Sequence, residues 1–313
     1  MKYHAIITAL AVVVAVVSCG GGGDYPPCEI VRLDHMIGDG AIPADSAARR
    51  AASLLFAVSG YGELNDSSVS IYADRPSVSI HRRAVDSAFT DISQLEGELG
   101  AVLGRASGLL PLVRVAGVYS VISPFNQSVF TVDSILYIGL NHYLGSSYGP
   151  YAYFPDYVRE RKIPARLIPD IAESLVRSAY PYRPGGKMVG RMLYEGAVVE
   201  AVMRLTGCDE AVALGYTPQQ FEWLSSNEAE MWKAVIERRL LFSSADDVAR
   251  SLIYPGPVAS VLHPEAPGAA GRFIGHRLIG AYLDSHSGTR LDSLLSSGFY
   301  DSDTALATTG YNP

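Results

Sequence analysis

The histidines are the first residues to consider, because imidazole is the commonest metal ligand in proteins. None of those after residue 4 precedes a glutamate, so the HExxH motif of zinc peptidases is absent. No two lie three to five residues apart, the spacing that aims two imidazoles from one helix at one ion. They are His35, His81, His142, His263, His276 and His286. We therefore expect no metal and no cofactor, and a zinc site of scattered histidines stays an alternative.

A serine in a glycine-rich segment offers a second chemistry. Residues 145–149 match the GxSxG pattern of serine hydrolases, in which Ser147 would be the nucleophile. The base would come from His263, His276 or His286. A nucleophile elbow places its serine on a sharp turn between a strand and a helix, but here four residues separate the predicted strand from Gly145, and Pro150 follows. A flexible loop is the favoured interpretation, with a hydrolase as the alternative.

Residues 143–157 are unusually aromatic, with five tyrosines and Phe154. Such rings could line a groove for a carbohydrate or a peptide, because stacking provides a large contact area. We favour the simpler interpretation that the segment is packed by its own rings.

The N-terminus predicts the compartment. Lys2 precedes a mostly apolar run over 5–17, which is too short to span a bilayer and is typical of a secretory signal. Val16-Val17-Ser18-Cys19 resembles a bacterial lipobox, which implies cleavage before Cys19 and acylation of that residue. The predicted organisation is a signal peptide over 1–18, a lipidated cysteine with a Gly/Pro tether over 19–28, and one globular domain over 29–313.

Composition narrows the remaining choices. The net charge of −7 argues against a dominant nucleic-acid surface, which usually carries a basic stripe. Beyond the signal, the sequence predicts no second membrane span. Cys28 and Cys208 remain, and they are either a disulfide or two free thiols.

The periodicity of apolar residues predicts a mostly helical α+β domain. Asp45 is an expected helix N-cap, and Thr217-Pro218 is an expected start of a long helix. The predicted helices cover 45–58, 84–106, 164–179, 187–205, 217–241, 270–284 and 289–296, and the predicted strands cover 112–122 and 134–140.

Several segments in order resemble the GldB family of gliding-motility lipoproteins of Bacteroidota, over nearly all of 29–296. They are residues 30–34, 138–145, 154–157, 168–170, 216–218, 227–232, 267–268 and 271–276. Asn141 stands where the family often has aspartate, which puts any role of that carboxylate in doubt.

The family is similar in architecture to zinc peptidases of the gluzincin kind, so the resemblance implies a zincin-like scaffold with a small sheet. Those enzymes carry HExxH on one helix and a further glutamate on a later helix. Here the first helix has Asp170 and Glu173 without a histidine, and the later helix keeps Glu195. Carboxylates alone suit zinc poorly. The resemblance thus implies a scaffold that has lost its metal, with a remnant cleft formed by Asp170, Glu173, Glu195 and His276.

The function that the resemblance implies is an accessory role in gliding motility, type IX secretion or a related envelope-assembly process. We expect a non-catalytic protein that is held by its N-terminal lipid to a membrane facing the periplasm or the cell surface. Its expected partners are envelope proteins of that machinery, and no nucleic acid. A divergent hydrolase, either metallopeptidase-like or based on Ser147, is the alternative.

Glu228 and Trp232 share one helical face, where a buried Glu228 would need a cationic partner such as Arg272 or Arg277.

Overall fold

The structure is a computed structural model that describes residues 25–183, 186–302 and 304–313. It is mostly helical with one small sheet, which confirms the predicted α+β class. The signal peptide and the lipobox with Cys19 lie outside the described residues. Within the described ranges, no helix has the length and apolar character needed to cross a membrane.

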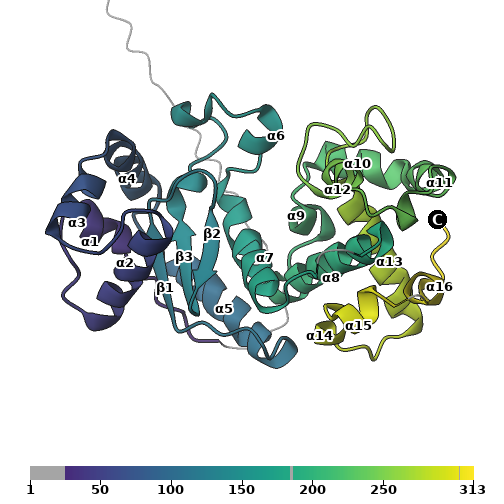
Figure 1. The fold of residues 1–313 in the computed structure, drawn as a ribbon, viewed down its shortest axis with the longest axis horizontal. Helices are drawn as coiled ribbons and strands as arrows, with labels where there is room; N and C mark the ends of the chain where they lie inside the picture. The colour runs from purple at the N-terminus through teal and green to yellow at the C-terminus, as the bar shows by residue number, and fades with distance from the viewer. Residues whose placement is uncertain (1–24, 184–185, 303) are drawn as a thin grey trace, which may run out of the picture.

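Figure 1 shows the sheet flanked by the N-terminal helices on one side, with α8–α16 forming the other side of the molecule. The helices before α8 are α1 (Leu33–Gly38), α2 (Ser46–Val58), α3 (Asp66–Ala73), α4 (Pro76–Ala88), α5 (Ser93–Leu109), α6 (Asp156–Arg159) and α7 (Leu167–Ala179). The later ones are α8 (Met188–Thr206), α9 (Glu210–Leu214), α10 (Pro218–Ser226), α11 (Glu228–Glu237), α12 (Asp246–Ile253), α13 (Ala270–Ser285), α14 (Leu291–Leu294), α15 (Ser297–Tyr300) and α16 (Ala305–Thr309).

The sheet has the strand order β1-β3-β2. β1 (Gly117–Val121) and β3 (Ile135–Gly139) are parallel and lie within the two predicted strand segments. β2 (Val129–Val132) pairs antiparallel with β3 and was not predicted. The turn between them runs through Asp133 and Ser134, both with positive φ, and it lacks the glycine that usually marks such a hairpin. Every residue of β3 is buried, as expected for the central strand.

Several helix boundaries agree closely with the prediction because local signals fix them. The Asp45 side chain accepts a hydrogen bond from the backbone N–H of Ala48 at 2.8 Å, which caps α2. The Thr217 hydroxyl and the Gln220 side chain form a capping box, with Pro218 at the first position of α10.

Two predicted helices are wrong in their continuity. The single helix predicted over 84–106 is divided into α4 and α5, because the Asp91 carboxylate accepts hydrogen bonds from both the backbone and the hydroxyl of Ser93 and so favours a turn there. The helix predicted over 217–241 is interrupted at Asn227, whose side-chain amide donates to the carbonyl of Trp223 at 2.7 Å. The predicted helix at 289–296 shortens to α14.

In the side of the molecule formed by α8–α16, the core is built on the crossing of α8 and α13. Two glycines allow these helices to approach closely. An ideal Cβ at Gly275 would lie 2.0 Å from the carbonyl oxygen of Met192, and one at Gly196 would lie 2.1 Å from the carbonyl oxygen of Gly275. The two helix backbones therefore touch, which fixes the height of every side chain that α8 and α13 present to α7.

The tether end of the chain is also fixed by glycines. An ideal Cβ at Gly100 on α5 would lie 2.1 Å from the carbonyl oxygen of Pro26, and one at Gly104 would lie 2.0 Å from the ring of Tyr25. Both remaining cysteines, Cys28 and Cys208, are free thiols in the structure. Of the two alternatives that the sequence left open, the structure thus has the unpaired one.

Candidate functional site

The predicted remnant cleft contains an ion-pair cluster in which α7, α8 and α13 meet. Glu195 is fully buried on α8, and both of its carboxylate oxygens are held by arginines. Its Oε1 lies 2.9 Å from Nη2 of Arg191 and 3.2 Å from Nη1 of Arg177, and its Oε2 lies 3.4 Å from Nε of Arg272 and contacts Nη2 of Arg177. Glu195 is therefore tied to three guanidinium groups.

Glu173, one helix away on α7, joins the same cluster. Its Oε1 lies 2.9 Å from Nη2 of Arg272 and accepts a hydrogen bond from Nε of Arg177 at 2.9 Å. Burial alone would raise the pKa of Glu173, but Arg272 and Arg177 outweigh it and hold that pKa well below its usual range. The carboxylate is therefore ionised at any physiological pH.

This donor set does not fit the zinc ion of a gluzincin. Two carboxylates meet three arginines, so the five groups carry a net charge of about +1 and repel a further cation. The carboxylate oxygens of the cluster already accept hydrogen bonds from Arg177 and lie within ion-pair distance of Arg272, and among the described residues no histidine contacts them. The arrangement is a buried salt-bridge network, in which each charge is compensated by its neighbours.

The sequence prediction found the two glutamates and missed the arginines that neutralise them. A signal was present: Glu173 and Arg177 are four residues apart on one helix, and so are Arg191 and Glu195. The pairing between the helices, through Arg177 and Arg272, depends on the α8–α13 crossing and has no counterpart in local spacing.

Asp170 lies one turn before Glu173 and has separate partners. Its Oδ1 is 2.5 Å from Nη2 of Arg166, and its Oδ2 accepts a hydrogen bond from the hydroxyl of Tyr143 at 3.0 Å. Arg166 is buried, and it also donates to the carbonyl of Val212 on α9. Asp170 thus fixes an arginine that joins α7 to α9.

His276, the fourth predicted cleft residue, lies elsewhere. It is one turn after Arg272 on α13 and contacts Oε1 of Glu210 at 2.8 Å and Oε2 of Glu200 at 3.2 Å. Burial alone would lower the pKa of His276, but the two carboxylates outweigh it and the pKa is raised. His276 acts as a cation between α8 and α9 rather than as a metal ligand.

Glu228 has the cationic partner that the sequence predicted. Nε of Arg277 lies 3.2 Å from its Oε2, and the hydroxyl of Tyr311 donates to its Oε1 at 2.8 Å. Of the two arginines named in that prediction, Arg277 is the partner, and Arg272 belongs to the glutamate cluster.

The serine-hydrolase alternative finds no geometric support at Ser147. This serine is exposed, and among the described residues it has no hydrogen bond to a histidine. A different serine, Ser123, lies 3.1 Å from Nε2 of His142. Nδ1 of that ring accepts from the ammonium of Lys162 at 3.2 Å, so Nε2 carries the hydrogen and donates to Ser123 and to the carbonyl of Pro124. A histidine in this tautomer cannot take a proton from Ser123.

Burial and Lys162 lower the pKa of His142 to about 3, so the ring is neutral at physiological pH. Burial lowers the pKa of Lys162 to about 8. Its ammonium lies 4.8–5.2 Å from the ring centres of Phe125, Tyr151 and Phe154. The cluster of Ser123, His142 and Lys162 was not predicted from the sequence, because its members come from segments up to about 40 residues apart.

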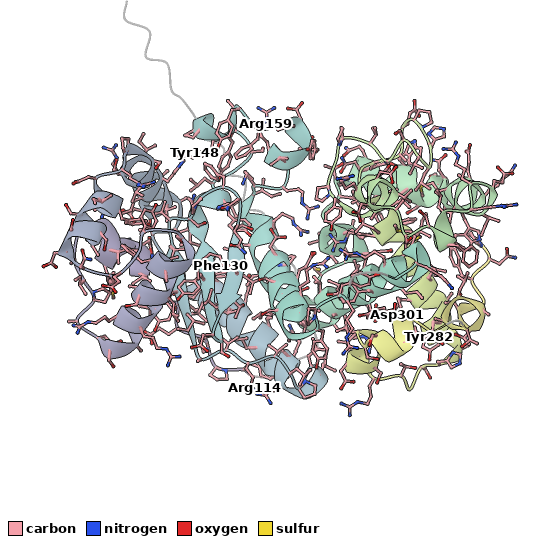
Figure 2. The ribbon with its side chains drawn as sticks, in the orientation of Figure 1. Arg114, Phe130, Tyr148, Arg159, Tyr282 and Asp301 are labelled. Atoms are coloured by element: carbon pink, nitrogen blue, oxygen red, sulfur yellow. The ribbon has the colours of Figure 1, made fainter. Side chains whose placement is uncertain are left out.

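The aromatic segment mostly packs on itself, as favoured from the sequence. Tyr143 and Tyr151 are buried, and the ring of Tyr151 contacts those of Tyr148 and Phe154 within the same segment. Tyr153 is 68% exposed. In Figure 2 Tyr148 lies in the loop above the sheet, and its hydroxyl contacts His81 on α4 at 3.0 Å.

Asn141, at the position where the resemblance suggested aspartate, has a structural role. Its side chain is fully buried, accepts from the backbone N–H of Ser123 and donates to the carbonyl of the same residue, both at 3.0 Å. An ionised aspartate has no donor for that carbonyl. The asparagine therefore closes the end of β1 onto the short turn at 140–142.

Two neighbouring cavities are the open part of the site. The first, of about 230 Å³, lies between the segment over 157–166 and the connection from α9 to α10. The second, of about 350 Å³, lies between that segment and the loop over 125–128. Tyr157, Arg161 and Pro255 line both cavities, so the two form one groove along a single stretch of chain. In Figure 1 this stretch begins at α6 and faces α9 and α10.

Asp34, His35 and Asp86 are close enough together to hold a cation. Arg32 occupies that position, however, with Nε and Nη2 donating to both oxygens of Asp34 at 3.0 and 2.8 Å. The cluster is therefore already compensated.

Comparison with known proteins gives the family. Searches of curated proteins and of solved structures found no match to the chain. A family model described as "Gliding motility protein GldB" matches residues 50–313, which include the sheet, the ion-pair cluster and both cavities. The chain therefore belongs to the GldB family of gliding motility proteins.

Proposed function

We propose that this protein is a lipid-anchored, non-catalytic component of the cell envelope, accessory to gliding motility, type IX secretion or a related assembly process. Family membership supports the connection with motility. In this proposal Cys19 carries the lipid, and the domain over 29–313 presents its groove to an envelope protein. Stable attachment to a membrane requires more than one acyl chain, and the thioether-linked and amide-linked chains of such a cysteine together meet this requirement.

The observation that supports a non-catalytic role is that arginines neutralise the charges of Glu173 and Glu195. Glu173 and Glu195 come from adjacent helices, as the HExxH motif and the further glutamate of a gluzincin do. We therefore propose that the scaffold is zincin-like, with arginines in place of the metal. Arg177 and Arg272 bridge the two carboxylates, which leaves no free oxygen pair for an ion. What remains available on this side of the molecule is a groove suited to binding.

The anchoring is tested by labelling cells with palmitate and separating membranes from soluble material. The wild-type chain is expected in the membrane fraction with label, and Cys19→Ser is expected in the soluble fraction without it. Cys28→Ser is the matched control, because this thiol lies in the folded region, and it should behave as the wild type. Full membrane retention of Cys19→Ser would contradict the proposal.

A further inference from the structure

Arg161 is a cation of the groove that no carboxylate compensates among the described residues. Arg161 makes no ion pair among the described residues, and its Nη1 donates a hydrogen bond to the carbonyl of Leu214 at 3.3 Å. By contrast, the guanidinium of Arg166 beside it is held by Asp170 and by the carbonyl of Val212. Arg161 is partly buried and lines both cavities.

The surroundings of Arg161 add positive charge. Burial is the largest cause that lowers the pKa of Arg161, followed by the nearby charges of Arg166 and Arg272. Asp170 and Glu173 oppose this effect, but both already pair with arginines. Nε of buried Arg166, which also lines the first cavity, has no hydrogen-bond partner in the described structure. An anion in this cavity would therefore meet one unpaired guanidinium and one unsatisfied N–H.

The local backbone makes room for the Arg161 guanidinium. Gly215 ends α9 with φ of +78°, and an ideal Cβ there would lie 2.5 Å from Nη1 of Arg161. The side chain thus occupies space that a larger residue at 215 would fill. Because the α9 end and the Arg161 stem both limit its movement, the guanidinium is held at the cavity wall.

The rest of the first cavity is mostly apolar. Its lining includes Ile163, Ala165, Val212, Pro218 and Pro255. A guanidinium fork matches the two oxygens of a carboxylate, while apolar walls favour a ligand whose carboxylate is joined to an apolar group. Free phosphate has no apolar part to bury. Glu160 also lines the cavity; because it is exposed, water weakens the repulsion between its charge and a bound carboxylate without abolishing it.

We propose that the first cavity is a subsite for a carboxylate attached to an apolar side chain, as at the C-terminus of a peptide, with Arg161 as its main contact. This inference rests on the proposed binding function and names the chemistry that the groove would recognise. A cavity of about 230 Å³ accommodates one residue rather than a long acyl chain, and the second cavity lets the preceding residues continue along Tyr157.

The test is calorimetric titration of the full-length lipoprotein in detergent with acetyl-Ala-Ala-Leu bearing a free carboxylate. The expected result is saturable binding that weakens with salt and falls about tenfold or more when the carboxylate is replaced by a carboxamide. Inorganic phosphate should compete weakly. Absence of binding, equal binding of the carboxamide, or phosphate competing as well as the peptide would each overturn the proposal.

Substitutions separate the charge of Arg161 from general effects. Arg161→Gln should weaken peptide binding about tenfold or more, because a hydrogen-bonded ion pair is lost. Glu160→Gln should strengthen binding a few-fold by removing a repelling charge. Arg159→Gln is the matched control: Arg159 is two residues away, pairs with Asp156, and appears at the outer edge of the molecule in Figure 2.

The fold of each variant is verified by circular dichroism. If Arg161→Gln is unfolded, Glu160→Gln decides the question, and unchanged affinity in that variant would overturn the proposal. Equal affinity of a folded Arg161→Gln variant and the wild type would also overturn it. A negative result here leaves the fractionation of Cys19→Ser unaffected, so failure of this subsite is distinguishable from failure of the anchoring proposal.

Discussion

Glu195 shows how a residue of a catalytic type can serve the fold. It is fully buried, and three arginines surround it. Removing one partner from such a cluster is more damaging than the cluster's net contribution to stability, because the remaining charges stay buried without compensation. The sequence contains the two glutamates and their i, i+4 arginines, but the ion pairs between helices are defined only once α7, α8 and α13 have packed.

Glu195→Gln tests this role. The substitution preserves the shape of the side chain and removes the charge, so we expect a loss of about 3–5 kcal/mol in the free energy of unfolding, measured by urea denaturation. Glu237→Gln is the control: its exposed carboxylate lies 3.8 Å from Lys233, and a loss below about 1 kcal/mol is expected.

The same experiment distinguishes a structural cluster from a metal site. Zinc should leave the urea midpoint of the wild type unchanged, because arginines hold the carboxylates. Zinc-dependent stabilisation that disappears in Glu195→Gln would contradict the structural role.

His276 predicts a pH dependence with a definite sign. Because its pKa is raised in the folded state, its stabilising contribution is complete below about pH 6.5 and is lost as the pH rises through the raised value. The pKa of Glu200 is lowered, so this partner stays ionised over the same range. The difference in unfolding free energy between the wild type and His276→Gln should be about 1.5–3 kcal/mol near pH 6 and smaller at pH 9. A difference that is constant or grows with pH would refute the ion-pair role.

At the scale of elements, local signals predicted where α2, α8 and α13 lie, because caps and apolar periodicity depend on neighbouring residues. Breaks that side chains impose were missed. Asp91 and Asn227 each hydrogen-bond their own backbone and divide a helix whose apolar pattern continues across the break. β2 was missed because the strand has only four residues and because the turn that follows it, at Asp133 and Ser134, lacks glycine.

The α8–α13 crossing carries its own prediction. Gly275→Ala places a methyl group against the carbonyl of Met192 on α8, so we expect destabilisation of about 1–3 kcal/mol or more, because backbone must move. Gly280→Ala, on the same helix with nothing within 4 Å of its ideal Cβ, should be neutral or stabilising by up to about 1 kcal/mol. Thermal unfolding measures the stability of both variants. Equal changes in stability would show that the α8–α13 crossing is not the tight contact described.

For the whole molecule, the order of weak motifs indicated the family, and the family model over 50–313 confirms it. The groove could not be predicted, because it depends on bringing residues 157–166 against 212–220 and 255–269. The groove is accessible to a ligand, whereas the carboxylates of the neighbouring ion-pair cluster are already neutralised by arginines. This contrast is the basis for proposing that the protein is a binding component. If Cys19 carries the proposed lipid, the six residues from there to Tyr25, about 20 Å of fully extended chain, keep the folded domain near the membrane.

The most direct test of this account is site-specific photocrosslinking in cells of the native host. A photoreactive phenylalanine replaces Tyr157, which lines both cavities, or Tyr153, which is more exposed and lines neither. The account predicts a discrete adduct with an envelope protein from position 157, little from position 153, and loss of the adduct when Cys19→Ser is combined with the position 157 probe. Equal adducts from both positions, or an adduct that persists without Cys19, would contradict the account.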